Sequence, residues 1–146
     1  MQGMTIIVKK VTQFLCGVIF LYGIYIVLHG HLTPGGGFAG GAIISGAFVL
    51  LVIAFGSESV ALRKEETGSS LVESTGVLAF LVLAALGMLA AGAGVFFQNF
   101  LPPGVLGRLV SAGVIPLYNI AVGLEVSAAL LTIFLALVIS KEEVFT

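Results

Sequence analysis

Four long apolar stretches, separated by short polar or glycine-rich segments, constrain this chain more than any other feature. They cover about residues 11–28, 38–56, 76–97 and 116–140, and only the last contains a charged residue, Glu125. A helix that crosses the hydrocarbon core of a bilayer needs about 20 predominantly apolar residues, so each stretch is long enough to cross once. We therefore predict an all-α integral membrane protein with four transmembrane helices, forming a single membrane domain over residues 1–146.

Composition excludes the common soluble classes. The chain is 59% hydrophobic and 9% charged, whereas a soluble domain carries about a quarter charged residues. A formal net charge of -1 provides no basic patch for nucleic acid, so the expected partners are the lipid bilayer and other membrane proteins. No nucleophile, base and orienting group can be assembled from the short loops, so we do not expect catalysis by this chain alone. One cysteine and two histidines cannot hold an iron–sulfur cluster, and we expect neither a cofactor nor a metal.

Basic residues predict the orientation, because Lys and Arg accumulate on the cytoplasmic side. Residues 57–73 are predicted to form a charged loop between the second and third spans. With four spans, this loop and both termini share a side. That side holds five basic residues, Lys9, Lys10, Arg63, Lys64 and Lys141, and the other holds Arg108. We therefore predict that both termini are cytoplasmic, in a multi-pass protein of the plasma membrane.

Glu125 is the main candidate for chemistry. It lies nine residues into the fourth stretch, roughly 13 Å along a helix and so near the middle of the bilayer. Intramembrane carboxylates are costly and usually functional. Small and polar residues recur with it at helical spacing: Tyr118, Ala121, Glu125, Ala128 and Thr132. Two interpretations stay open: an ion or proton pathway through Glu125, Tyr118 and Thr132, or a structural carboxylate that is bonded to a neighbouring subunit.

Two histidines follow the first stretch. His29 and His31 fall short of the three or four ligands that zinc requires. Tyr22, Tyr25 and His29 share a helical face, which would suit a proton path that starts at His29. The sequence favours the alternative that His29 caps the end of the first helix.

Glycines dominate the connection between the first two spans. Pro34 followed by Gly35, Gly36 and Gly37 predicts a tight turn. Gly36 with Gly40, and Gly37 with Gly41, are small pairs at a spacing of four that allow helices to approach closely. These surfaces predict more helical partners than one chain supplies, and hence a subunit of a larger complex.

The same region carries a family resemblance. Residues 30–41, which include His31, Pro34, Gly35, Gly36, Gly37, Phe38, Gly40 and Gly41, resemble the G-H-x-x-P-G-G-G-F-x-G-G signature of the MnhB subunit of Mrp-type (Mnh) multisubunit Na+/H+ antiporters. Related subunits occur in membrane-bound hydrogenase-type respiratory complexes. The fourth stretch departs from the family motif F-E-L-G, because this chain has Tyr118-Asn119-Ile120-Ala121 there. The departure leaves a family role for Glu125 open.

The resemblance implies an accessory membrane subunit of an Mrp-type cation/proton antiporter module. The module would be either a stand-alone Na+/H+ antiporter or the ion-translocating part of a hydrogenase-like complex, with large antiporter-type subunits or redox subunits as partners. In this interpretation Glu125, His29, Tyr118 and Thr132 belong to an ion or proton pathway. The alternative is a structural helix-packing subunit with no ion contact. An independent small transporter is a third hypothesis, which the short loops disfavour.

Overall fold

The structure, a computed structural model, describes residues 4–56, 62–90, 95–105, 107–108 and 111–144. It contains the four helices α1 (Ile6–Leu28), α2 (Gly36–Phe55), α3 (Leu62–Ala90) and α4 (Ile115–Val144). Each includes a segment long and apolar enough to cross a membrane: Ile6–Leu28, Gly36–Phe55, Thr67–Ala90 and Ile115–Lys141. The predicted all-α fold with four membrane-length helices is confirmed.

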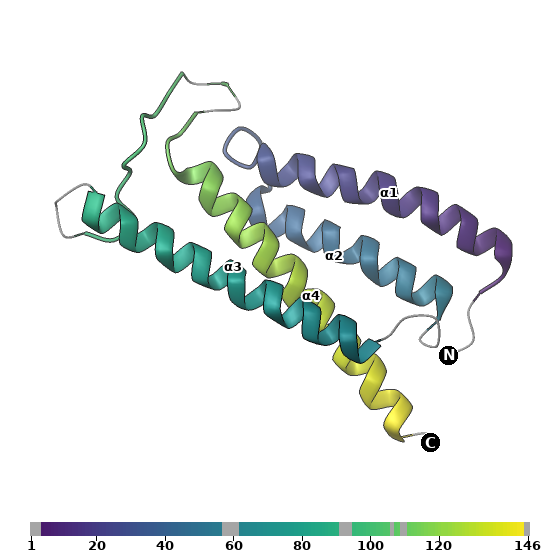
Figure 1. Cartoon of the computed structure of the whole chain (residues 1–146). Coiled ribbons are helices and arrows are strands. Elements are labelled where there is room, and N and C mark those ends of the chain that lie inside the picture. The colour runs from purple at the N-terminus through teal and green to yellow at the C-terminus, as the bar shows by residue number, and fades with distance from the viewer. Residues whose placement is uncertain (1–3, 57–61, 91–94, 106, 109–110, 145–146) are drawn as a thin grey trace.

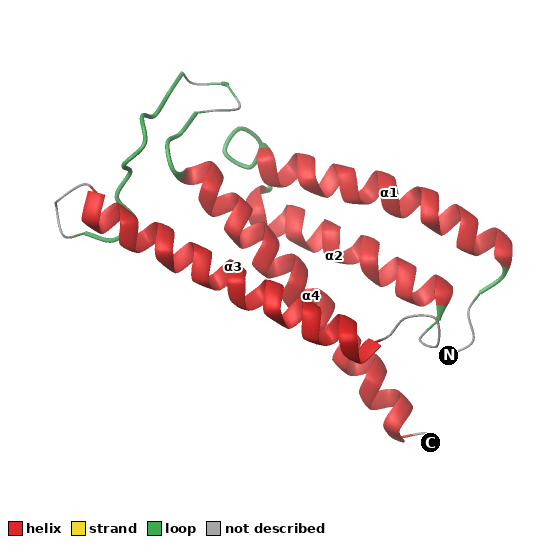
Figure 2. Ribbon diagram, in the orientation of Figure 1, coloured by secondary structure: helices red, strands yellow, loops and turns green. Residues whose placement is uncertain are grey.

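The helices form one layer in the order α1, α2, α4, α3 (Figures 1 and 2). α2 packs against α1 on one side and α4 on the other, and α4 also packs against α3. α1 makes a smaller direct contact with α4, where Val27 lies against Gly123. The start of α1 and the end of α4 lie at one end of the layer, here the termini end. The opposite end, here the hairpin end, holds the turn of residues 29–35 and the segment of residues 95–114. Neighbouring helices along the chain are therefore antiparallel.

Glycines bring α2 close to both of its neighbours. A Cβ built on Gly40 would lie 2.8 Å from the carbonyl oxygen of Gly23 in α1, and one on Gly41 would lie 2.7 Å from the carbonyl oxygen of Gly123 in α4. Both distances are too short for a real side chain, so each position accepts only hydrogen. Without a hydrophobic force between helices in lipid, close backbone packing of this kind is what holds membrane helices together.

The third helix starts earlier than the sequence predicts. Among the described residues α3 covers Leu62–Ala90, so residues 62–73 of the predicted charged loop are helical. Residues 91–94 of the predicted helix lie outside the described part of the chain, and residues 95–97 are not helical. Charges mark the end of a membrane span, but Arg, Lys and Glu are good helix formers, so the helix runs through them. At the other end Phe97 has φ 64°, outside any helix. Residues 57–61 of the predicted loop lie outside the described part of the chain.

This longer helix places Glu73 inside a membrane-length segment. The apolar span of α3 is Thr67–Ala90, so Glu73 lies six residues from its start, about 9 Å along the helix. The prediction that the four spans contain only one charged residue, Glu125, is therefore wrong.

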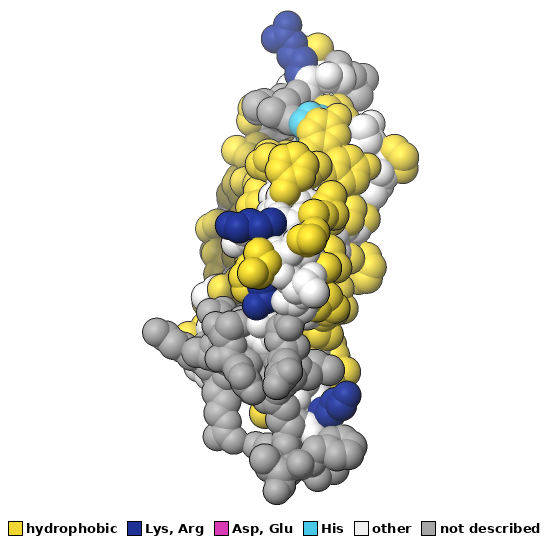
Figure 3. Space-filling view, turned by 90° about the vertical axis from the view of Figure 1, so that its right-hand side faces the viewer, with side chains coloured by type: hydrophobic (Ala, Val, Ile, Leu, Met, Phe, Trp, Pro, Cys, Tyr) yellow, Lys and Arg dark blue, Asp and Glu magenta, His cyan; other side chains and the backbone are white. Residues whose placement is uncertain are grey.

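Most large apolar side chains point outward. In the space-filling view the described surface is largely hydrophobic, interrupted by a few Lys and Arg side chains (Figure 3). Among the large residues Leu135 is the most deeply buried, at 1% exposed, and it packs with Val52 near the termini end of α2 and α4. Since a single layer of helices has little interior, the two apolar faces must be covered by lipid or by other membrane proteins.

Candidate functional site

The polar side chains of α4 that the sequence singles out lie along its contact with α3. Tyr118, Glu125 and Thr132 are seven residues apart, about 10.5 Å per step along the helix. Facing them on α3 are Phe80, Gly76 and Ser69 respectively. We call these six residues the α3–α4 seam.

Three contacts define the seam. The rings of Tyr118 and Phe80 meet edge to face with centroids 5.2 Å apart. A Cβ built on Gly76 would lie 2.8 Å from the Cβ of Glu125, so the glycine lets the backbone of α3 approach this carboxylate-bearing residue. The hydroxyl oxygens of Ser69 and Thr132 are 2.7 Å apart and hydrogen-bonded. The polar residues of α4 are thus kept against a neighbouring helix and away from lipid over about 21 Å of its length.

Glu125 is the charged member of the seam. It lies ten residues after Ile115, about 15 Å into α4, and is partly buried. Within the described part of the chain it has no hydrogen-bond or ion-pair partner, in contrast to Thr132, which also donates to the carbonyl oxygen of Ala128 at 2.9 Å. A partly buried carboxylate without a partner is available for proton exchange or for a group from another subunit.

His29 lies on a different helix from the seam. It ends α1, and its ring donates through Nδ1 to the carbonyl oxygen of Tyr25 at 3.0 Å while the two rings stack with centroids 4.0 Å apart. The carbonyl oxygen of His29 accepts the backbone N–H groups of Leu32 and Thr33 at 2.8 and 2.9 Å. This geometry is that of a helix cap, at the hairpin end of α1.

The signature glycines shape the turn between α1 and α2. Gly35 and Gly36 have φ values of 140° and 72°, which residues other than glycine rarely adopt. Pro34 and Phe38 are exposed, Phe38 at 65%, so they face outward from the layer. Residues 29–35, here the signature hairpin, therefore depend on glycine for their path.

Asn119 of α4 packs against Gly30 of the signature hairpin and Gly36 at the start of α2. A Cβ on Gly30 would lie 2.8 Å from its Nδ2, and one on Gly36 would lie 3.5 Å from its Oδ1. His31 reaches a second segment, since its Nε2 lies 3.4 Å from the carbonyl oxygen of Arg108. In the sequence Asn119 stands out only as a departure from the family motif. An amide in the first turns of an apolar helix was the available signal.

Several buried polar atoms at the hairpin end have no hydrogen-bond partner among the described residues. They are His31 Nδ1, Gln98 Oε1, Tyr118 Oη and Asn119 Nδ2. Buried polar atoms are nearly always hydrogen-bonded, so this end of the layer is where water or groups from neighbouring subunits are needed. Tyr118 belongs both to this group and to the seam.

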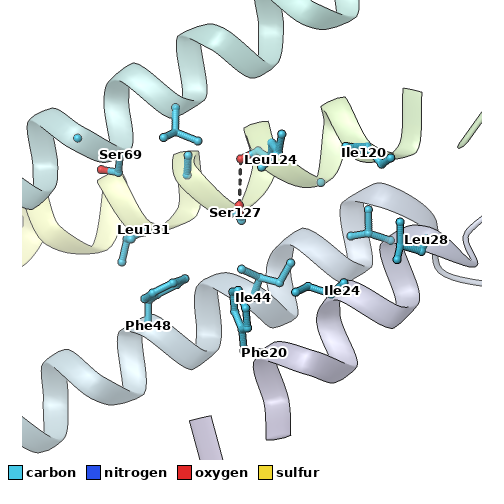
Figure 4. A pocket seen from close by; sticks show the side chains of 15 residues that line it. Phe20, Ile24, Leu28, Ile44, Phe48, Ser69, Ile120, Leu124, Ser127 and Leu131 are labelled. Carbon is cyan, nitrogen blue, oxygen red and sulfur yellow. Dashed lines mark hydrogen bonds between the residues drawn. The ribbon is translucent and has the colours of Figure 1, made fainter. Parts of the chain in front are cut away.

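An apolar groove of about 620 Å³ lies on one face of the layer (Figure 4). Phe20 and Phe48 border it from α1 and α2, across from Leu124 and Leu131 of α4 and Ser69 of α3. The Ser127 hydroxyl donates to the carbonyl oxygen of Leu124 in its own helix at 2.9 Å. None of the described side chains that line the groove is charged, so this lining suits acyl chains or an apolar helix and does not suit ions.

No group of three His, Cys, Asp or Glu side chains that could hold a metal occurs within the described part of the chain.

The layer and its seam define a class of protein: a multi-pass helical membrane subunit with apolar outer faces and a polar line between two helices. Residues 7–132 match the family described as a domain related to the MnhB subunit of Na+/H+ antiporter, and the chain belongs to this family.

Individual relatives agree with the family. An uncharacterized protein of Methanocaldococcus jannaschii is 45% identical over 75% of this chain and 43% of its own length. A Staphylococcus aureus protein that carries the name antiporter subunit mnhB2 is 38% identical over 41% of this chain and 43% of its own length. Among solved structures, a chain of the membrane-bound sulfane sulfur reductase, an archaeal respiratory membrane complex, is similar with a TM-score of 0.73 and 30% identity. That match covers 88% of this chain and 56% of the other, so this chain spans only about half the length of these relatives.

Proposed function

We propose that this chain is an accessory membrane subunit of an Mrp-type cation/proton antiporter module and that the α3–α4 seam is part of its proton or ion route. Membership of the MnhB-related family supports the module. The likeness to a chain of a respiratory membrane complex supports a redox-linked setting as well as a stand-alone antiporter. The partners would be large antiporter-type subunits, with redox subunits added in the second setting, in the plasma membrane.

One observation carries the route: Glu125 lies about 15 Å into a membrane-length helix, in line with Tyr118 and Thr132 and against Gly76 of α3. A charge in this environment is costly, so its retention requires a use or a partner. Because the polar line continues for about 21 Å of a hydrocarbon core of about 30 Å, it spans much of the distance that a proton must travel. His29 caps α1 at the hairpin end, next to Gly30, whose built Cβ would lie 2.8 Å from Asn119 Nδ2 of α4, so the proposed route includes His29 at that end.

The structural alternative rests on a different observation. The glycine contacts of α2 and the Ser69–Thr132 bond hold the layer together without any ion. In that case Glu125 accepts a hydrogen bond from a neighbouring subunit, and the chain is a spacer that orders its partners.

The variant Glu125→Gln separates the two functions. It keeps the size of the side chain and its ability to accept a hydrogen bond but removes its ionisable proton. In the purified, reconstituted complex we expect cation-driven proton flux to fall by about a hundredfold or more, the scale of losing a proton-transfer group, with subunit composition unchanged. Unchanged flux in an intact complex would favour the spacer.

The partners can be identified directly. Purification in mild detergent through a tag on this chain, followed by mass spectrometry, should recover large antiporter-type subunits. Additional iron–sulfur subunits would identify the redox-linked setting. Recovery of the chain alone would contradict the accessory-subunit proposal.

A further inference from the structure

Glu73 lies on the face of α3 that meets α4. The residues of α3 that contact α4 in the seam are Ser69, Gly76 and Phe80, and Glu73 falls between them at the helical spacing i, i+4, i+7, i+11. Burial agrees with this placement, because Ser69 and Gly76 are buried and Glu73 and Phe80 are partly buried. The residues around Glu73 on α3 are all exposed: Ser70, Leu71, Val72, Ser74 and Thr75.

The helix register puts Glu73 within about one turn of Glu125. Gly76 lies against the Cα and Cβ of Glu125 at 3.0 and 2.8 Å, measured from the Cβ built on the glycine. Glu73 is three residues before Gly76, about 4.5 Å along α3 toward the termini end. One further turn in the same direction, Ser69 is bonded to Thr132. The second carboxylate therefore lies between the Glu125 contact and the hydroxyl pair.

We propose that Glu73 is a second proton-carrying carboxylate of the α3–α4 seam, exchanging a proton with Glu125. This inference rests on the function proposed above and extends it to a residue on the facing helix. Glu73 carries the proton in the part of the seam nearer the termini end, and Glu125 carries it in the part nearer the hairpin end.

The antiparallel packing supports this division. Every Cα–Cβ bond of a helix tilts toward the N-terminus of that helix. α3 starts at the termini end and α4 at the hairpin end, so the two glutamates lean in opposite directions from the level at which their helices touch. Along the seam the polar groups then follow in the order Tyr118, Glu125, Glu73 and the Ser69–Thr132 pair, with the buried and unbonded Tyr118 Oη at the hairpin end.

The step itself needs no further reactant. Because the two side chains lean in opposite directions, the proton passes through a hydroxyl or water between them. The O–H bond of one carboxylic acid breaks and an O–H bond forms on the other carboxylate, while the intervening group accepts one proton and gives up another. The total charge of the pair stays the same during the exchange.

The test uses the intact complex and two readouts. First, cation-driven proton flux is measured for Glu73→Gln, Glu73→Asp and Glu125→Gln, with Ser74→Ala as the control because Ser74 is exposed and donates to the Ser70 carbonyl oxygen of its own helix. Second, the wild-type complex is treated with dicyclohexylcarbodiimide, which adds to protonated carboxyl groups in apolar surroundings, and the labelled residues are identified by mass spectrometry. Labelling by the carbodiimide requires that the carboxyl group is protonated, and it does not require transport.

We expect Glu73→Gln to lower the flux by about a hundredfold, as for loss of a proton-transfer group, Glu73→Asp to restore part of it, and Ser74→Ala to keep the wild-type rate. We also expect carbodiimide adducts on Glu73 as well as on Glu125. Normal flux in Glu73→Gln with low flux in Glu125→Gln would overturn this inference and leave the proposed function standing. Normal flux in both would overturn both. If Glu73→Gln does not assemble, the absence of an adduct on wild-type Glu73 overturns the inference and its presence supports it.

Discussion

Thr132 makes a hydrogen bond between side chains that joins α4 to α3. Its hydroxyl serves two contacts, because it donates to the carbonyl oxygen of Ala128 within α4 and lies 2.7 Å from the hydroxyl of Ser69 in α3. Ser74, also on α3, instead donates to a carbonyl oxygen of its own helix. The serines of α3 therefore differ in whether they connect two helices.

This difference predicts the effect of Thr132→Val. The substitution keeps the shape of the side chain and removes the interhelical bond, so we expect a loss of about 1 kcal/mol, the order found for hydrogen bonds between membrane helices. The thermal stability of the purified complex measures it. A shift no larger than that of Ser74→Ala would show that the Ser69–Thr132 bond does not stabilise the seam.

Asn119 offers a second prediction at this scale. Asn119→Ala would remove the amide that packs between Gly30 and Gly36, so we expect faster amide hydrogen exchange in residues 30–36 while α3 stays protected. Hydrogen exchange with mass spectrometry on the complex measures both regions. Equal exchange in variant and wild type would mean that α4 does not anchor the signature hairpin.

α2 is the element on which the layer depends, because it has helices on both sides. Its signature glycines are divided between them: Gly40 meets α1, whereas Gly37 and Gly41 meet α4. Gly46, farther along α2, has no atom within 4 Å of a built Cβ. The same residue type thus has different roles along one helix.

The pair Gly41→Ala and Gly46→Ala tests this assignment. At Gly41 the new methyl group would lie 2.7 Å from the Gly123 carbonyl oxygen, and we expect a loss of about 1–3 kcal/mol, as for overpacking. At Gly46 it meets open space, and we expect a gain of about 0.5–1 kcal/mol from helix propensity. The yield and melting temperature of the complex compare the two. Similar losses at both positions would show that close packing against α4 is not the role of Gly41.

The whole molecule is a single layer, so both of its faces border lipid or other subunits. Phe14 and Ile7, at 74% and 77% exposed, lie on α1 at one edge of the layer, and Leu71 and Leu89 are exposed on α3 at the other. An isolated layer has little interior to stabilise it. Neighbouring subunits are therefore expected to contribute much of its stability.

The orientation of the layer is a prediction at this scale. Positive charges predict the termini end in the cytoplasm, with the signature hairpin outside. Single cysteines at Thr33 and Ser140, in a Cys16→Ala background, would report it through an impermeant maleimide applied to intact cells. We expect labelling at position 33 and none at 140, and the reverse pattern would invert the orientation of the whole layer.

The number of membrane-length helices, a turn that includes Pro34 and Gly35 and the place of Glu125 among small residues at helical spacing could all be predicted from the amino-acid sequence, whereas Gly36 and Gly37, which were expected in the turn, begin α2. These features follow from local rules, since bilayer thickness sets span length and helical periodicity sets which residues share a face. The signature also identified the family, because a run of closely spaced glycines is specific at the level of sequence.

Which helices touch became clear only from the folded chain. Charge along the sequence suggested that Glu73 lay in a loop, whereas helix propensity carries α3 through the charged segment and packing turns Glu73 toward α4. His29 caps α1 at the hairpin end, whereas Glu125 lies about 15 Å into α4, and whether the two share one pathway stays a prediction. Neither the order of helices in a layer nor their register follows from local sequence, because both depend on contacts between residues far apart in the chain, such as Gly76 with Glu125.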